Sequence, residues 1–113
     1  MEDNIYEGVI PMSRRFRLAK TFEIPEGRPK TFNVNGDQVL IVNIRGKFYA
    51  IADRCTHMGY PLYLGSINGR VITCGFHHAK FDVTTGEVLS LPAHESLKTY
   101  KVIIEDSDVL LEL

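Results

Sequence analysis

Two short clusters of cysteine and histidine constrain this chain more than any other feature of its sequence. The first cluster contains Cys55 and His57, and the second contains Cys74 and His77. Sixteen residues separate the two pairs, and the chain has no further cysteine. Thiolate sulfur and imidazole nitrogen are protein ligands of zinc and of several iron centres. These four residues, called the candidate ligands below, therefore predict a metal centre held between two loops.

Length, composition and charge predict one globular domain spanning residues 1–113. The chain of 113 residues has 44% hydrophobic and 24% charged residues, close to the averages for single globular domains. The net charge of −1 at pH 7 provides no general attraction to nucleic acid or to an anionic membrane surface. We therefore expect no nucleic-acid partner.

The sequence also lacks the signals for insertion into a membrane or export across one. No apolar run approaches the roughly 18 residues that a spanning helix needs. The first residues, Met1–Asn4, have neither the basic nor the apolar region of a secretory signal. We therefore expect a cytoplasmic protein without a membrane span, in a compartment where thiols stay reduced and available to a metal.

Short apolar or alternating segments separated by turn signals predict an all-β fold. Strands are expected over residues 14–20, 30–34, 39–44, 48–52, 70–73, 80–83, 87–89, 97–104 and 109–113. Residues 39–42 are apolar at consecutive positions, so this strand should be buried on both faces. Asn35-Gly36 is typical of a type I′ hairpin turn, and residues 66–69 are predicted to form another turn. This pattern indicates an antiparallel sandwich or barrel, preceded by a lead-in arm over residues 1–13.

The residues around the candidate ligands resemble those of Rieske iron–sulfur proteins. The match is firm from about residue 53 to residue 93, and four segments carry it: Met58–Leu62, His78–Asp82, Thr85–Glu87 and Leu91–Ala93. The resemblance implies one 2Fe-2S cluster per chain, with the two cysteines on one iron and the two histidines on the other. It also implies a Rieske-like antiparallel β-sandwich, in which a small cluster-binding subdomain occupies about residues 53–93.

Other interpretations of the candidate ligands remain open from the sequence. The two cysteines could form a disulfide, all four residues could hold a structural zinc ion, or the arrangement could arise by chance in a plain β domain. Zinc modules usually space each pair by two to four residues and are smaller. Two further histidines are not expected to be ligands: His78 should lie at the surface or behind a ligand, and His94 in an exposed loop. The resemblance implies that Leu91–Ala93 packs beside the cluster and shields it.

Four positions near the candidate ligands depart from one branch of the Rieske family. High-potential members carry an extra cysteine in each loop, and these cysteines form a disulfide; Tyr60 and Phe76 occupy the matching positions here. We expect these two rings to touch, or one of them to cap the cluster. High-potential members also have serine and tyrosine hydroxyls that donate to sulfur atoms, where this chain has Ala79 and Phe81. The resemblance therefore implies the soluble, low-potential, ferredoxin-like branch.

The function implied by this resemblance is transfer of one electron at a time between proteins. Similar ferredoxins relay electrons from a flavoprotein reductase to the terminal oxygenase of aromatic-ring dioxygenases, or to another redox protein. The chain has no 2-His-1-carboxylate set and no dinucleotide-binding fingerprint, so we expect an electron carrier and not an enzyme. Two alternatives are the small subunit of a nitrite-reductase-like enzyme and a non-redox, zinc-stabilised interaction module.

Overall fold

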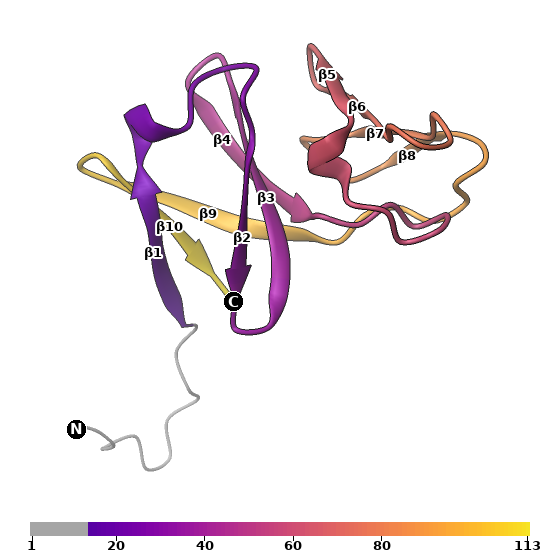
Figure 1. Cartoon of the computed structure of the whole chain (residues 1–113). Helices are drawn as coiled ribbons and strands as arrows, with labels where there is room; N and C mark the ends of the chain where they lie inside the picture. Colours follow the sequence, from indigo (N-terminus) through magenta and orange to yellow (C-terminus); the bar gives the residue numbers. More distant parts are fainter. Residues whose placement is uncertain (1–13) are drawn as a thin grey trace.

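The computed structural model describes residues 14–113, which form two antiparallel sheets (Figure 1). The larger sheet has the strand order β1-β10-β9-β4-β3-β2. Its strands are β1 (Arg15–Lys20), β2 (Lys30–Val34), β3 (Asp37–Ile44), β4 (Lys47–Ala52), β9 (Thr99–Glu105) and β10 (Asp108–Glu112). The smaller sheet consists of β5 (Ser66–Asn68), β6 (Val71–Thr73), β7 (Lys80–Asp82) and β8 (Val88–Ser90). The all-β prediction is confirmed, and the predicted lead-in arm lies outside the described residues.

The first hairpin of the larger sheet is closed by the turn that the sequence predicted. Asn35 has φ 54° and Gly36 has φ 94°, which is the backbone of a type I′ turn. The same pattern recurs between β3 and β4, where Arg45 has φ 54° and Gly46 has φ 85°. In that turn the side chain of Asn43 accepts a hydrogen bond from the N–H of Gly46 at 2.8 Å. These turns fix the register of the strands β2 to β4.

Strand β3 is buried on both of its faces, as its apolar run predicted. Val39 and Ile41 belong to one apolar cluster, inside the larger sheet, whereas Leu40 and Val42 belong to a second cluster. Each of these four side chains is at most 1% exposed. The second cluster also contains Cys55 and other residues of the smaller sheet and its loops. One face of the larger sheet therefore packs against the cysteine-containing loops.

In the sequence, the strands of the smaller sheet lie between β4 and β9, which are neighbouring strands of the larger sheet. The chain leaves β4 at Ala52 and returns at Thr99, where β9 begins. Strands β4 and β9 pair with each other, with Ile51 opposite Thr99. The residues between these two strands, including all four candidate ligands, form one insertion that leaves and rejoins the larger sheet at the same pair of strands (Figure 1). Both ends of the insertion are thereby held at one place.

The structure differs from the sequence prediction in a strand and in two short helices. Residues 66–69 were predicted to be a turn, but Ser66–Asn68 forms β5, and the reversal follows at Gly69, where φ is 62°. The half-buried side chain of Ile67 packs on the second apolar cluster and lies opposite Ile72 of β6, which explains why this short segment is extended. The sequence also gave no signal for two 3-10 helices, η1 (Thr21–Glu23) and η2 (Leu62–Leu64). No helix within residues 14–113 is long and apolar enough to cross a membrane.

Candidate metal centre

The two loops that carry the candidate ligands have the same backbone hydrogen-bond pattern. In the first loop, the N–H of Cys55 donates to the C=O of Tyr60, and the N–H of Gly59 donates to the C=O of Cys55, both at 2.7 Å. In the second loop, the N–H of Cys74 donates to the C=O of Ala79 at 2.8 Å, and that of His78 donates to the C=O of Cys74 at 3.0 Å. Each cysteine therefore begins a tight loop that closes five residues later.

The same position of each loop has a left-handed backbone. The residue four places after the cysteine is Gly59 in the first loop, with φ 79°, and His78 in the second, with φ 65°. This conformation reverses the chain, so that each loop closes within five residues of its cysteine. His78 is exposed, and its backbone geometry gives it a structural part in the loop. That shared pattern was missed in the sequence, because most histidines have negative φ even though histidine is enriched among the few non-glycine residues with positive φ.

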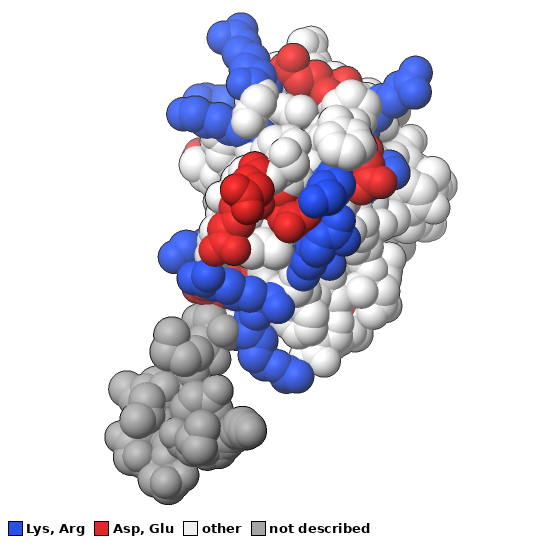
Figure 2. All heavy atoms as spheres, turned by 90° about the vertical axis from the view of Figure 1, so that its left-hand side faces the viewer, with Lys and Arg blue, Asp and Glu red and all other residues white. Residues whose placement is uncertain are grey.

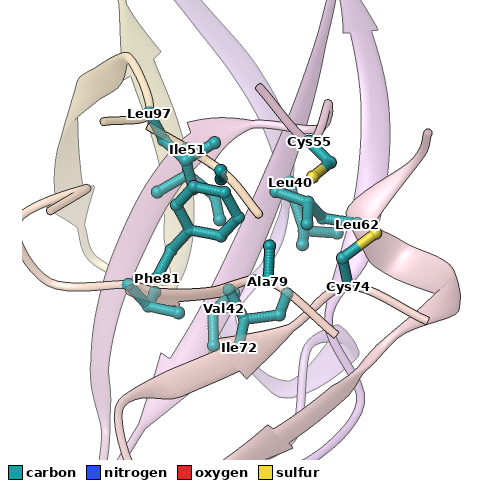
Figure 3. Packing of buried hydrophobic residues seen from close by; sticks show 12 residues of the cluster. Leu40, Val42, Ile51, Cys55, Leu62, Ile72, Cys74, Ala79, Phe81 and Leu97 are labelled. Carbon is teal, nitrogen blue, oxygen red and sulfur yellow. The ribbon is translucent and has the colours of Figure 1, made fainter. Parts of the chain in front are cut away.

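The two thiols are buried beside each other at the inner end of the loops. Cys55 is 1% exposed and Cys74 is 0% exposed, and both are free. They lie at one side of the second apolar cluster, next to Leu40 and Leu62 (Figure 3). Burial raises the pKa of the Cys55 thiol and the neighbouring Cys74 raises it further, whereas the backbone N–H groups of His57 and Met58 act in the opposite direction. Those N–H groups are therefore directed at the sulfur, where they favour a thiolate.

The two imidazoles lie together at the outer end of the loops. The ring centroids of His57 and His77 are 4.9 Å apart, and the ring planes meet at 85°. Both side chains are exposed. Within residues 14–113, no three Cys, His, Asp or Glu side chains converge as the ligands of one metal ion do. The structure brings the candidate ligands together as two pairs, an inner pair of thiols and an outer pair of imidazoles.

This donor set fits a binuclear iron–sulfur cluster. Two thiolates and two neutral imidazoles are the ligands that a mixed-ligand 2Fe-2S cluster takes, one pair for each iron. The backbone of the second loop also packs closely against the backbone of η2: a Cβ atom added at Gly75 would lie 2.9 Å from the carbonyl oxygen of Leu64. The second loop thus rests directly on η2, and a side chain at that position would push the loop away.

Comparison with known proteins identifies the family. Residues 14–101 match the Rieske [2Fe-2S] domain. This chain belongs to the Rieske family. A Rieske domain carries a 2Fe-2S cluster, so the expected cofactor is confirmed. The family assignment made from residues 53–93 is confirmed as well.

The relatives with similar sequences are ferredoxin components of dioxygenase systems. The chain is 37% identical to the ferredoxin component of the naphthalene 1,2-dioxygenase/salicylate 5-hydroxylase systems of a Ralstonia species, over 80% of this chain and 88% of the relative. It is 40% identical to the biphenyl dioxygenase ferredoxin subunit of Pseudomonas sp. strain KKS102, over 80% of this chain and 84% of the relative. These matches support the ferredoxin branch of the Rieske family over the high-potential branch.

Solved structures support the same fold. The ferredoxin of carbazole 1,9a-dioxygenase from Nocardioides aromaticivorans IC177 superposes with a TM-score of 0.83 at 30% identity, covering 86% of this chain and 95% of the other. A ferredoxin of Sphingomonas yanoikuyae B1 also gives a TM-score of 0.83, at 29% identity, covering 88% of this chain and 99% of the other. The Rieske fold predicted from the sequence is therefore confirmed.

Two aromatic residues join the Rieske loops where high-potential relatives have a disulfide. The rings of Tyr60 and Phe76 are stacked, with centroids 4.1 Å apart and planes 19° apart. The prediction of an aromatic contact is confirmed. The Tyr60 ring also lies against His77, at a centroid distance of 5.6 Å and a tilt of 40°.

The other residues singled out in the sequence lie around the Rieske loops. His94 is exposed, as expected. In the segment Leu91–Ala93, Ala93 is buried in the same apolar cluster as the two cysteines, whereas Leu91 is 69% exposed. Only part of that segment therefore packs against the cysteine-containing core.

Polar contacts that sequence reasoning missed hold the Rieske loops to their surroundings. The buried carboxylate of Asp53 accepts a hydrogen bond from the N–H of Tyr63 at 2.9 Å, which ties the start of the first loop to η2. The hydroxyl of Thr56 donates to the C=O of Glu95 at 2.7 Å. An acidic residue at the end of an apolar strand was the one available signal for Asp53. Nothing in the sequence marked the contact between residues 39 positions apart.

Proposed function

We propose that this protein is the ferredoxin component of a ring-hydroxylating dioxygenase system. It accepts one electron at a time from a flavoprotein reductase and passes it to a terminal oxygenase, and it turns over no substrate itself. The relatives named above are ferredoxins of naphthalene and biphenyl systems, and the solved structures include a complex of oxygenase and ferredoxin in carbazole 1,9a-dioxygenase. The observation that carries the proposal is the buried pair of thiols beneath an exposed pair of imidazoles.

Within this proposal, Cys55 and Cys74 hold the inner iron of the cluster, and His57 and His77 hold the outer iron. The bound cluster supplies reversible one-electron chemistry. The protein's own residues bury the sulfur ligands, direct backbone N–H groups at the Cys55 sulfur and leave the imidazole edges accessible. The proximity of the thiols and the 4.9 Å separation of the imidazole rings support this assignment.

Partner proteins reach the cluster through the imidazole face. Apolar side chains next to the histidines are exposed there: Met58 is 60% exposed beside His57, and Phe76 is 48% exposed beside His77. Leu64, whose carbonyl lies against the second loop, is 53% exposed. An exposed apolar surface of this kind is typical of a protein-binding site. Here Met58 and Phe76 are adjacent in the sequence to the two histidines, which suits brief docking of a redox partner.

The proposal includes a cytoplasmic location and one Rieske domain over residues 1–113, with the cluster-binding subdomain over about residues 53–93. Free, buried thiols are stable in a reducing compartment. The insertion of the smaller sheet between β4 and β9 supports a subdomain with these limits.

The ligand assignment is tested by replacing each candidate ligand with alanine. Each variant should lose the visible absorption and the EPR signal of the reduced 2Fe-2S cluster, with partial unfolding because metal binding is coupled to folding. His78→Ala and His94→Ala are matched controls, since both histidines are exposed and are not among the proposed ligands. A His77→Ala protein with the wild-type EPR spectrum would contradict the assignment.

The carrier function is tested with the purified protein. Titration with dithionite should consume one electron per chain. The reduced protein should then be oxidised by a ring-hydroxylating oxygenase and regenerated by a flavoprotein reductase and its nicotinamide. A colourless protein that contains zinc and takes up no electron would instead support the interaction-module alternative.

A further inference from the structure

The stacked pair of Tyr60 and Phe76 links the two cluster loops. Tyr60 lies five residues after Cys55 in the first loop, and Phe76 directly precedes His77 in the second. Their rings lie nearly parallel with centroids 4.1 Å apart. Stacked aromatic pairs stabilise a protein beyond the apolar area that they bury.

This contact is important because the backbone hydrogen bonds of each loop stay within that loop. The backbone hydrogen bonds of Cys55 and Cys74 described above stay within their own loops. Among residues 14–113, no backbone hydrogen bond joins residues 55–60 to residues 74–79. The aromatic stack therefore connects, through side chains, two loops that these backbone hydrogen bonds do not join.

Tyr60 connects this stack to ligands in both loops. Its carbonyl accepts the hydrogen bond from the N–H of Cys55, and its ring lies 5.6 Å from the ring of His77. The side chain of Tyr60 also packs on the apolar cluster that contains both cysteines, whereas Phe76 is 48% exposed. Tyr60 is thus the inner and Phe76 the outer member of the pair.

We propose that Tyr60 and Phe76 are positioning residues: their stack fastens the two loops to each other without a covalent bond and sets the orientation of the His77 imidazole. The proposal rests on the assignment of His77 as a ligand of the outer iron. Loss of the stack should loosen the imidazole side of the cluster, because the thiol side is held separately by the buried core.

The test compares Tyr60→Leu, Phe76→Leu and the double variant with the wild-type holoprotein. Tyr60→Phe keeps the aromatic ring and is the conservative variant. Phe22→Leu is the control for loss of an exposed aromatic residue, because Phe22 is 75% exposed in η1 on the larger sheet. Three quantities are measured: the rate of iron release to a chelator, the EPR spectrum of the reduced cluster and the midpoint potential.

We expect each leucine variant to release iron about tenfold faster, which corresponds to about 1.4 kcal/mol. The EPR spectrum should broaden or shift and the potential should move, while Tyr60→Phe and Phe22→Leu keep the wild-type values. Since the two rings act on each other, the double variant should release iron little faster than either single variant.

Several results would overturn the proposal. Wild-type release rates in both leucine variants would show that the stack fastens nothing. Faster release with an unchanged EPR spectrum and potential would reduce the pair to a structural contact that does not orient His77. A double variant equal to the product of the single effects would show that the rings act independently. Failure of the ligand assignment is distinguishable, because the wild-type protein would then lack the Rieske EPR signal.

Discussion

Ala79 and Phe81 contribute apolar side chains to the buried cluster that contains the two cysteines. Both side chains are 0% exposed and belong to the apolar cluster that contains Cys55 and Cys74 (Figure 3). Neither carries a hydrogen-bond donor, so neither stabilises the negative charge that reduction adds to a cluster. We therefore expect a potential in the lower part of the Rieske range, nearer about −150 mV than about +300 mV.

Restoring hydroxyl groups at these positions should raise the potential. If each new hydrogen bond is stronger by roughly 1 kcal/mol in the reduced state, Ala79→Ser and Phe81→Tyr should each add about 40 mV. Potentiometry of both single variants and the double variant measures this. Phe48→Tyr, in the other apolar cluster, is the control. A wild-type potential well above zero would show that burial or backbone donors dominate over these two side chains.

Asp82 should make the folded protein sensitive to acid. Its carboxylate is buried; burial would raise its pKa, but hydrogen bonds from the hydroxyl and N–H of Thr84 and the positive charge of Arg70 lower it below the ordinary value of 3.8. A lowered pKa in the folded state contributes stability that is fully present above the unfolded value and is lost as pH falls through the folded value.

Unfolding of wild-type protein and Asp82→Asn should therefore differ with pH. At neutral pH, the variant should be less stable by about 1–3 kcal/mol, because the partly buried N–H and hydroxyl of Thr84 lose a charged acceptor. The difference should shrink as pH falls below about 4. Urea midpoints measured from acidic to neutral pH would show this. A difference that is independent of pH would mean that the charge of Asp82 contributes nothing.

At the scale of the loop, the two left-handed positions differ in the residue that they carry. Glycine adopts the φ of 79° at position 59 without strain. Any other residue there would be strained, and its Cβ atom would also lie only 3.2 Å from the Nε atom of Arg54. Gly59→Ala should therefore destabilise the protein by about 1–2 kcal/mol. His78→Gly should be nearly neutral, since the relief of strain is offset by the greater freedom of glycine in the unfolded chain. Thermal unfolding of the holoproteins measures both. Equal losses in the two variants would show that backbone strain does not determine stability at these two positions.

The strands could be predicted from the sequence because each carries a local signal. The I′ turn at Asn35-Gly36 and the consecutive apolar residues of β3 followed from residue type alone. Strand β5 was missed because it has only three residues and is extended by its pairing with β6, a tertiary effect that local propensity does not report.

The site was predictable in its composition but not in its arrangement. The spacing of the four candidate ligands indicated a metal centre, yet it was the family resemblance that assigned thiols and imidazoles to different irons. The stack of Tyr60 on Phe76 followed from the positions where relatives carry a disulfide. The loop closures at Tyr60 and Ala79 are bonds between backbone groups. Such bonds depend little on side-chain identity and leave no mark in the sequence.

The whole molecule has chemically different ends. On the side that carries β1, Lys and Arg side chains are interspersed with Asp and Glu (Figure 2). Several of them are paired: Arg17 and Lys20 contact Asp108 at 2.9 and 2.8 Å, and Arg15 contacts Glu112 at 3.2 Å. Exposed ion pairs of this kind add little stability. The imidazole end instead exposes apolar side chains such as Met58.

This arrangement has a consequence for electron transfer, because the cysteine side is buried and the imidazole side is exposed. Electrons should enter and leave through the same face, so the reductase and the oxygenase should bind in turn. Met58→Glu and Leu64→Glu place a charge in that face, which costs free energy when a partner covers it. Both variants should slow reduction by the reductase and oxidation by the oxygenase, each by about tenfold or more.

Stopped-flow kinetics of the two half-reactions measure this effect, and excess oxidised oxygenase should inhibit reduction of the wild-type protein. Arg17→Ala, on the charged side, is the control and should leave both rates unchanged. Because Met58 and Leu64 lie outside the proposed ligand set, their variants should keep the wild-type EPR spectrum, so slower transfer can be assigned to docking. Variants that slow one half-reaction and spare the other would show that the two partners use separate faces of the molecule.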